Sequence, residues 1–205
     1  MYTDVPAYCA LKRASKHMKT EQEQQQILVI DDEPEIADLY ATWLQRNHEV
    51  QTAYSGPEAL ERVDESVDIV FLDRRMPRMT GDEVLSKMRS RGLRCRVVLM
   101  TAVDPDFDII DIDFDEYLTK PVMHDDITGT IETLRDRPTG DETVREYHAL
   151  VSKKATLETE KTHSELRHSE RYQRLVERIE KLADEADISR SNAEDEFLFR
   201  EFSEK

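Results

Sequence analysis

Five short apolar runs alternate with segments of helical periodicity between residues 27 and 137, and this alternation constrains the fold more than any other feature of the sequence. Apolar runs of this length, bounded by turn residues, are typical of strands buried on both faces of a sheet. Strands that alternate with helices predict a parallel sheet covered by helices on both sides. We therefore predict an α/β fold, a flavodoxin-like doubly wound sheet of five parallel strands. The strands are expected at residues 27–31, 49–54, 68–73, 96–101 and 116–120.

Polar side chains stand at the carboxyl ends of the predicted strands. These residues are Asp31, Asp32, Asp73, Thr101 and Lys120. Because ligands of doubly wound sheets bind beyond the carboxyl ends of the strands, we expect these side chains to form one site. Three converging carboxylates repel one another, and Mg²⁺ would relieve the repulsion because it prefers carboxylate, carbonyl and phosphate oxygens. A metal, a lysine cation, a hydroxyl and one carboxylate free to act as nucleophile are suited to phosphoryl transfer.

The motifs around these residues are DD (31–32), LDRRMPRMTG (72–81), MTA (100–102) and YLTKP (117–121). In order and spacing they resemble the receiver domain of two-component response regulators, and the resemblance covers residues 27–137. It implies that a sensor histidine kinase phosphorylates Asp73. It also implies that Mg²⁺ is bound by the carboxylates of Asp31, Asp32 and Asp73 and by the backbone carbonyl of Arg75.

The same resemblance implies roles for four residues that would contact or follow the phosphoryl group. Lys120 would pair with the phosphoryl oxygens, and Thr101 would move to hydrogen-bond them. Tyr117 would change rotamer together with Thr101. The small side chain of Ala102 would leave room for the phosphate.

The chain departs from the family pattern before the last predicted strand. Asp113 and Phe114 stand where a Gly-Ala pair is usual, and residues 104–113 are acidic and weakly patterned. A helix is therefore only weakly indicated at residues 104–113, on the face with which receivers commonly dimerise or signal. The departures make the output surface harder to predict than the chemistry.

Other interpretations of the strand-end residues stay open at this point. Taken singly, Asp31 and Asp32 are also typical of helix caps, and Lys120 of a surface lysine. A receiver fold that has lost its chemistry is a milder alternative, which the complete set of motifs disfavours. A Mg²⁺-dependent phosphatase would also form an aspartyl phosphate, but it needs an acid/base aspartate two residues after the nucleophile, where this chain has Arg75. We therefore expect a signalling protein and not an enzyme.

Residues 142–186 form a second predicted unit, separated from the first by Pro138 and Gly140. Apolar residues recur at helical spacing from Val144 onward, are interrupted near residues 162–164, and then continue. This pattern predicts two amphipathic helices, arranged either as an antiparallel hairpin or as a coiled-coil element of a homodimer. The segment is similar to the HalX-type output region found behind receivers in haloarchaea.

Basic residues of the second unit step by four and three and are predicted to form a stripe on one helix. They are Arg167, Arg171, Arg174, Arg178 and Lys181. The stripe would contact DNA phosphates in a transcription factor, or an acidic partner protein. Alternatively it is a solvated face, paired with acidic residues of the same helix. Residues 138–205 are net acidic and contain no recognisable helix-turn-helix, which disfavours DNA binding.

The composition bounds the remaining expectations. The net charge is −16, which fits either a protein that works at high salt or an ordinary acidic cytosolic protein. No run approaches the ~20 apolar residues of a membrane helix, so we expect a cytoplasmic protein without membrane contact. Cys9 and Cys95 do not form a disulfide framework. Residues 1–26 are expected to be a disordered tail, with translation starting at Met1 or Met18, and residues 187–205 a flexible one.

Overall fold

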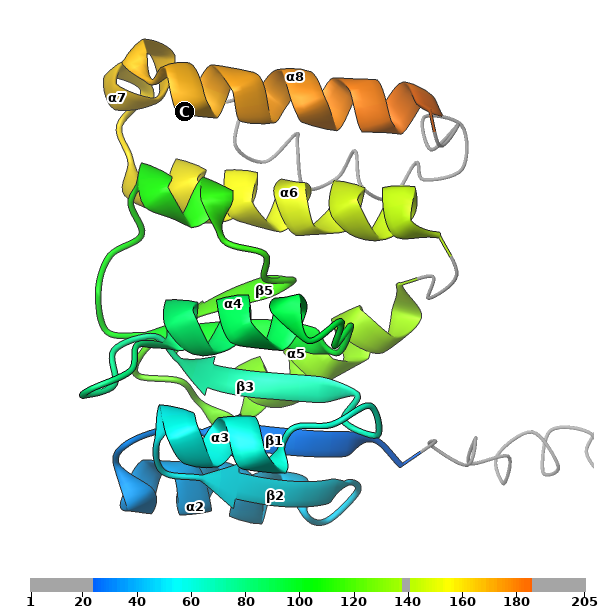
Figure 1. The fold of residues 1–205 in the computed structure, drawn as a ribbon. Helices are drawn as coiled ribbons and strands as arrows, with labels where there is room; N and C mark the ends of the chain where they lie inside the picture. Colours follow the sequence, from blue (N-terminus) through cyan, green and yellow to red (C-terminus); the bar gives the residue numbers. More distant parts are fainter. Residues whose placement is uncertain (1–23, 138–140, 186–205) are drawn as a thin grey trace, which may run out of the picture.

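The computed structural model describes residues 24–137 and 141–185. Its five strands pair in parallel in the order β2-β1-β3-β4-β5, as the flavodoxin-like prediction requires (Figure 1). Each strand lies within one residue of its predicted position, and the first begins inside the predicted tail. The strands are β1 (Gln26–Ile30), β2 (Glu49–Ala53), β3 (Ile69–Asp73), β4 (Arg96–Thr101) and β5 (Glu116–Thr119). The rest of the predicted N-terminal tail, residues 1–23, and the predicted tail at 187–205 lie outside the described residues.

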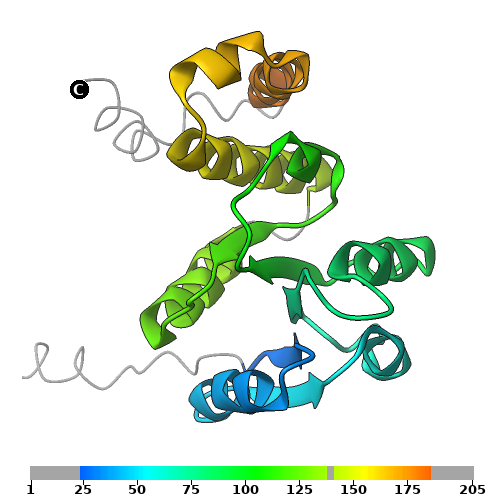
Figure 2. The same ribbon diagram turned by 90° about the vertical axis from the view of Figure 1, so that its left-hand side faces the viewer.

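Four helices cover the sheet, and local sequence signals fix where they begin. Pro34 occupies the first turn of the first helix, and the Ser55 side chain accepts a hydrogen bond from the Glu58 N–H at the start of the second. Thr80 and Glu83 form a capping box at the start of the third. The helices are α2 (Pro34–Leu44), α3 (Gly56–Arg62), α4 (Gly81–Ser90) and α5 (His124–Asp136). One core cluster packs α2 and α5 on one face of the sheet, and another packs α3 and α4 on the other (Figure 2).

Between β4 and β5 the chain forms only a short 3₁₀ helix, η1 (Phe107–Asp111). The weak pattern of residues 104–113 predicted little helix here, and the structure bears this out. The acidic residues of this segment compete with helix formation by hydrogen-bonding nearby backbone, and the Asp106 carboxylate accepts from the Phe107 N–H. As a result, the connection between β4 and β5 adds no full helix to the face that carries α3 and α4.

The C-terminal segment folds back on itself as α6 (Glu142–Glu160), α7 (His163–His168) and α8 (Glu170–Glu185). We call these three helices the C-terminal hairpin, because α8 runs antiparallel to α6 and packs on it (Figure 1). Of the two predicted arrangements, an antiparallel hairpin or a coiled-coil element, the chain thus forms the hairpin. The prediction of two helices is wrong, because the Thr162 capping box starts a separate short helix. Within the described residues, none of the helices has the length and apolar character needed to cross a membrane.

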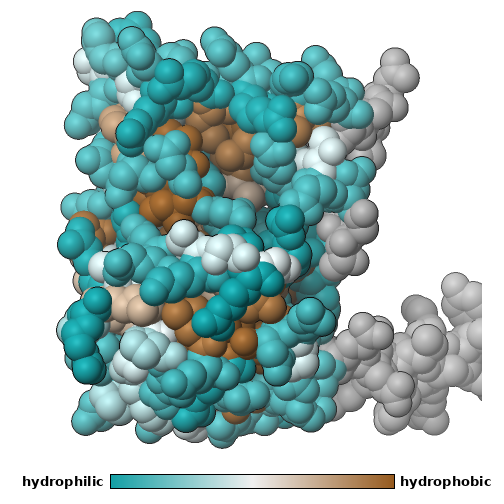
Figure 3. Space-filling view, in the orientation of Figure 1, coloured by the Kyte–Doolittle hydropathy of each residue, from teal (hydrophilic) through white to brown (hydrophobic). Residues whose placement is uncertain are grey.

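The C-terminal hairpin shares one hydrophobic core with the sheet. Leu157 of α6 and Ile179 of α8 belong to the same buried cluster as Ile109 of η1 and Phe114. Helices α6 and α8 contact η1, and α6 also contacts the edge strand β5. In Figure 3, apolar residues lie in seams between the helices, while the outward faces are hydrophilic. The C-terminal hairpin therefore covers the region that η1 is too short to cover.

Candidate functional site

A buried cluster of charges lies at the carboxyl ends of the strands. Lys120 Nζ lies 2.7 Å from Asp31 Oδ2 and 2.6 Å from Asp73 Oδ1. Asp31 directly follows β1, Asp73 ends β3, and Lys120 directly follows β5. Asp31 is 0% exposed and Asp73 is 4% exposed. The structure therefore brings Asp31, Asp73 and Lys120 into direct contact, as the sequence predicts.

Backbone amides hold the second oxygen of each carboxylate. The Arg75 N–H donates to Asp73 Oδ2 at 2.8 Å, and the Glu33 N–H donates to Asp31 Oδ1 at 3.0 Å. Each carboxylate thus bonds to the shared ammonium group through one oxygen and to the backbone through the other. This fixes both carboxylate planes before any ligand arrives.

Burial dominates the electrostatics of the cluster. Burial raises the pKa of Asp73, against the hydrogen bond and charge of Lys120, and the charge of Asp31 raises it further. Burial alone would lower the pKa of Lys120, but hydrogen bonds to Asp31 and Asp73 outweigh it, so the pKa is raised. One ammonium group thus faces two carboxylates, which leaves an excess of negative charge at a buried position.

The metal prediction is only partly matched by the geometry. Within residues 24–137 and 141–185, no three His, Cys, Asp or Glu side chains are grouped so as to hold a metal ion. In the structure Lys120 lies between Asp31 and Asp73 and supplies the positive charge. Asp32 is half-buried beside Asp31. The set of metal ligands, including the Arg75 carbonyl, stays a prediction.

Two of the other predicted site residues hydrogen-bond the same loop residue. Thr101 is fully buried, and its Oγ1 accepts from the Val103 N–H at 3.2 Å. The Tyr117 hydroxyl donates to the Val103 carbonyl at 3.1 Å, and its side chain is buried. Ala102 is exposed. Thr101 and Tyr117 therefore both bond to the loop that leads from β4 to η1.

The loop after Asp73 requires a glycine where it approaches its own backbone. The Gly81 N–H donates to the Arg74 carbonyl at 3.0 Å. A Cβ added at Gly81 would lie 2.4 Å from the Asp73 carbonyl oxygen, far inside van der Waals contact. The glycine of the LDRRMPRMTG motif thus lets α4 begin directly against the strand end that carries Asp73.

Sequence reasoning missed Arg74, which is buried directly after Asp73. Its guanidinium pairs with Asp82 of α4, with Nε 3.1 Å from Oδ1, and also with Asp108 of η1. Burial alone would lower the pKa of Arg74, but the hydrogen bonds to Asp82 and Asp108 outweigh it, so the pKa is raised. The position of Arg74 in the sequence could have indicated its role, because a charged residue at the end of a buried strand needs partners of opposite charge.

The predicted basic stripe is divided between two helices. Arg167 lies on α7 and the other four residues on α8, so the prediction of one helix is wrong. Ser169 separates them with an extended backbone, and its Oγ accepts from the Tyr172 N–H at 3.2 Å. Two stripe residues pair beyond α8, namely Arg178 with Glu146 of α6 at 2.7 Å and Arg171 with Asp111 of η1 at 3.5 Å. Lys181 pairs with Glu185 on its own helix at 3.6 Å.

Two known proteins resemble this chain over different lengths. The alkaline phosphatase synthesis transcriptional regulatory protein PhoP of Bacillus subtilis is 33% identical over 116 residues, covering 54% of this chain and 48% of that protein. A putative transcriptional regulator of Haloferax volcanii is 45% identical over 172 residues, covering 83% of this chain and 29% of the relative. The chain thus spans less than a third of one relative and about half of the other.

A solved structure shows the same receiver fold. It is the response regulator receiver domain protein from Clostridium thermocellum, which is 29% identical with a TM-score of 0.50, over 55% of this chain and 95% of that one. The family model for the response regulator receiver domain matches residues 27–132, and the HalX domain model matches residues 136–203. The chain therefore belongs to the response regulator receiver domain family and carries a HalX domain after the receiver.

Proposed function

We propose that this chain is a phospho-accepting response regulator, phosphorylated on Asp73 by a sensor histidine kinase. The observation that carries the proposal is the setting of Asp73, a buried carboxylate bonded to Lys120 through one oxygen and to the Arg75 N–H through the other. A carboxylate oxygen would attack the phosphorus of the kinase phosphohistidine. The P–N bond would break, the imidazole would leave and take up a proton from solvent, and an aspartyl phosphate would form.

Mg²⁺ fits the charge of this site. Two buried carboxylates face one ammonium group, so the site has an excess negative charge that a divalent cation would neutralise. We infer that Asp31, Asp32, Asp73 and the Arg75 carbonyl would hold the ion. When bound, it would offset the charge of the phosphoryl oxygens. Lys120 would pair with those oxygens from the other side.

The residues around the site favour a switch that reaches the loop after β4. Thr101 Oγ1 would leave the Val103 N–H to hydrogen-bond the phosphoryl group, and Tyr117 would leave the Val103 carbonyl with it. Ala102 is small and exposed, which leaves room for the phosphate. Such a shift changes the populations of two states of the loop.

The C-terminal hairpin is the proposed output element. We assign residues 27–137 to the receiver and residues 142–186 to the output domain, which would signal by forming a homodimer or by binding a partner protein. Direct DNA contact is the second candidate, favoured by the names of the relatives. The charge of α8 disfavours it, since the helix carries four basic residues and five acidic ones.

Phosphoryl uptake tests the proposal. Wild type, Asp73→Asn and the control Asp125→Asn, whose carboxylate is fully exposed in α5, would be incubated with acetyl phosphate, with and without Mg²⁺, at several molar salt. Intact mass should show one phosphoryl adduct that requires Mg²⁺ and is lost only in Asp73→Asn. An adduct of equal amount in Asp73→Asn would refute the assignment. Size-exclusion chromatography and a gel shift across salt concentrations would separate dimer output from DNA binding.

A further inference from the structure

Arg74 joins the phosphoacceptor strand to η1. Its N–H donates to the Met100 carbonyl at 2.9 Å, so the backbone position is fixed against β4. Its guanidinium grips Asp82 through two parallel contacts, Nε to Oδ1 and Nη2 to Oδ2, both 3.1 Å. Nη2 also donates to Asp108 of η1. Because a buried guanidinium is costly without its partners, these two carboxylates set its position.

Several residues of η1 and its flanks contact the C-terminal hairpin. Lys161 lies 3.1 Å from Asp106, and Lys153 Nζ donates to the Ile110 carbonyl at 3.1 Å. Ile109 is fully buried in the core shared with the hairpin. In both ribbon views η1 lies against α6 with α8 close by (Figures 1 and 2). A displacement of η1 would therefore disturb its contacts with the C-terminal hairpin.

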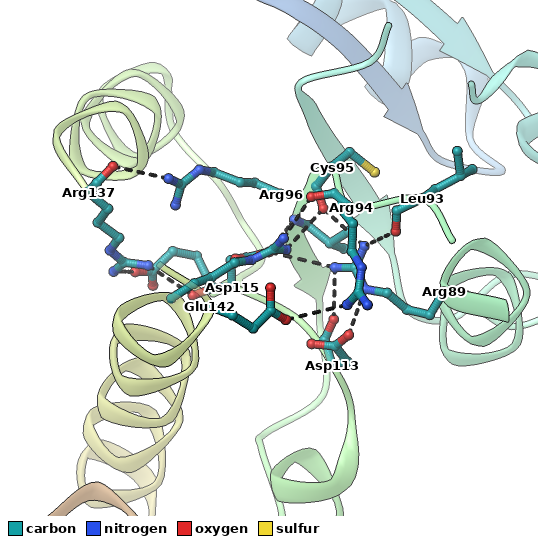
Figure 4. Close-up of polar contacts among 12 residues, drawn as sticks. Arg89, Leu93, Arg94, Cys95, Arg96, Asp113, Asp115, Arg137 and Glu142 are labelled. Carbon is teal, nitrogen blue, oxygen red and sulfur yellow. Dashed lines mark hydrogen bonds and ion pairs between the residues drawn. The ribbon is translucent and has the colours of Figure 1, made fainter. Parts of the chain in front are cut away.

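The opposite end of the C-terminal hairpin is anchored away from the site. Arg145 in the first turns of α6 lies 3.0 Å from Asp115 and donates to the Arg94 carbonyl at 2.7 Å. Asp115 is held by the Val97 N–H at 2.8 Å, and Figure 4 shows it facing Arg89 beside the Arg94–Glu142 pair. These contacts lie at the amino ends of β4 and β5, at the far end of the strands from Asp73.

We propose that Arg74 is a positioning residue and that its ion pair with Asp108 is a latch between the phosphorylation site and the C-terminal hairpin. The inference rests on the proposed function. The closed latch holds η1, and with it the adjoining ends of α6 and α8, against the receiver. Phosphorylation of Asp73 draws Thr101 and Tyr117 away from Val103, and the loop that begins there carries Asp108 away from Arg74. Arg74 keeps its two contacts with Asp82, so the guanidinium stays paired while the latch opens.

The test opens the latch without touching the phosphorylation site. Asp108→Asn removes the charge of a half-exposed partner, Asp108→Glu retains it, and Asp104→Asn is a matched control in the same loop. Hydrogen exchange by mass spectrometry would follow peptides of η1, α8 and the first turn of α6, with and without acetyl phosphate and Mg²⁺. Intact mass would follow phosphoryl uptake in the same samples.

Without acetyl phosphate, Asp108→Asn should exchange about five- to tenfold faster than wild type in η1 and α8, with the first turn of α6 unchanged. Asp108→Glu and Asp104→Asn should match wild type. Phosphorylated wild type should show the same faster exchange, and Asp108→Asn should take up phosphate normally with little further change. Equal exchange in all four proteins would overturn the latch even if the adduct forms. A wild type without adduct would overturn the proposed function, while the comparison of unphosphorylated variants would still decide on the latch.

Discussion

Leu157 lies on α6 but is buried in the same cluster as receiver residues, so its substitution should destabilise the receiver as well as the C-terminal hairpin. Leu157 is 0% exposed, so Leu157→Ala removes one methine and two methyl carbons from a closed site. We expect the free energy of unfolding to fall by about 3 kcal/mol, within the range of roughly 2–5 kcal/mol for such substitutions. With an m-value of about 2 kcal/mol per molar urea, the midpoint should fall by about 1.5 M.

The chain contains a single tryptophan, Trp43, which reports on the opposite face of the sheet. It lies on α2 and packs against Tyr40 and His124, whose ring centroids are 5.5 and 5.7 Å away. Tryptophan fluorescence therefore follows the receiver, whereas far-ultraviolet circular dichroism also follows the C-terminal hairpin. If the shared core makes one cooperative unit, Leu157→Ala should lower the urea midpoint equally by both probes.

A matched control is Leu39→Ala, because Leu39 is 46% exposed on α2. It should change the free energy of unfolding by less than about 0.5 kcal/mol. The reasoning would be refuted if Leu157→Ala moved the circular dichroism transition and left the Trp43 transition in place. That result would mean that the hairpin unfolds independently and that its apolar contacts with the receiver contribute little.

Three further substitutions test individual contacts by chemical denaturation. Gly81→Ala should destabilise the fold by about 2 kcal/mol or more, because its methyl group would collide with the Asp73 carbonyl. Asp115→Ala should cost about 3–5 kcal/mol, because it removes the carboxylate that pairs with half-buried Arg145 and accepts from the buried Val97 N–H. Lys153→Met should change the free energy of unfolding by less than about 1 kcal/mol near neutral pH. The substitution loses the contacts of the ammonium group, but it also removes the cost of burying that group. Burial lowers the pKa of Lys153 below 10.5, so the folded protein releases this proton at a lower pH than the unfolded chain does. The free energy of unfolding of wild type should therefore rise relative to that of Lys153→Met as the pH rises towards about 10.

The sequence was sufficient to predict the sheet and the centre of the site, because both depend on local signals combined with one topological rule. Each strand is an apolar run bounded by turn residues. Asp31 and Lys120 are 89 positions apart, but parallel strands bring their carboxyl ends to one edge, and the two side chains meet at 2.7 Å. The metal ligands among Asp31, Asp32, Asp73 and the Arg75 carbonyl stay a prediction, because a motif does not show which contacts its side chains make before an ion binds.

The docking of the C-terminal hairpin could not be predicted, because an amphipathic pattern shows that a face is covered but not by what. Lys153 illustrates the difficulty. It lies three residues after Leu150 and four before Leu157, and so on the inward face of α6, although lysine is seldom fully buried in proteins. In the structure Nζ reaches the Ile110 carbonyl and lies 5.0 Å from the centre of the Phe114 ring. Those partners belong to the segment that departs from the family pattern, and only the tertiary fold brings them to α6.

The energetics of the shared core limit how far the C-terminal hairpin can move in signalling. Full release would expose Leu157, Ile109 and Phe114, which are all completely buried. At about 1.5–3 kcal/mol for each side chain, the three alone would cost roughly 5–9 kcal/mol. An allosteric coupling typically supplies about 1–3 kcal/mol, which is sufficient to break one half-exposed ion pair such as Arg74–Asp108 but not to undock the hairpin. We therefore expect phosphorylation to loosen the hairpin at η1 while the Arg145–Asp115 anchor at the other end of α6 stays closed.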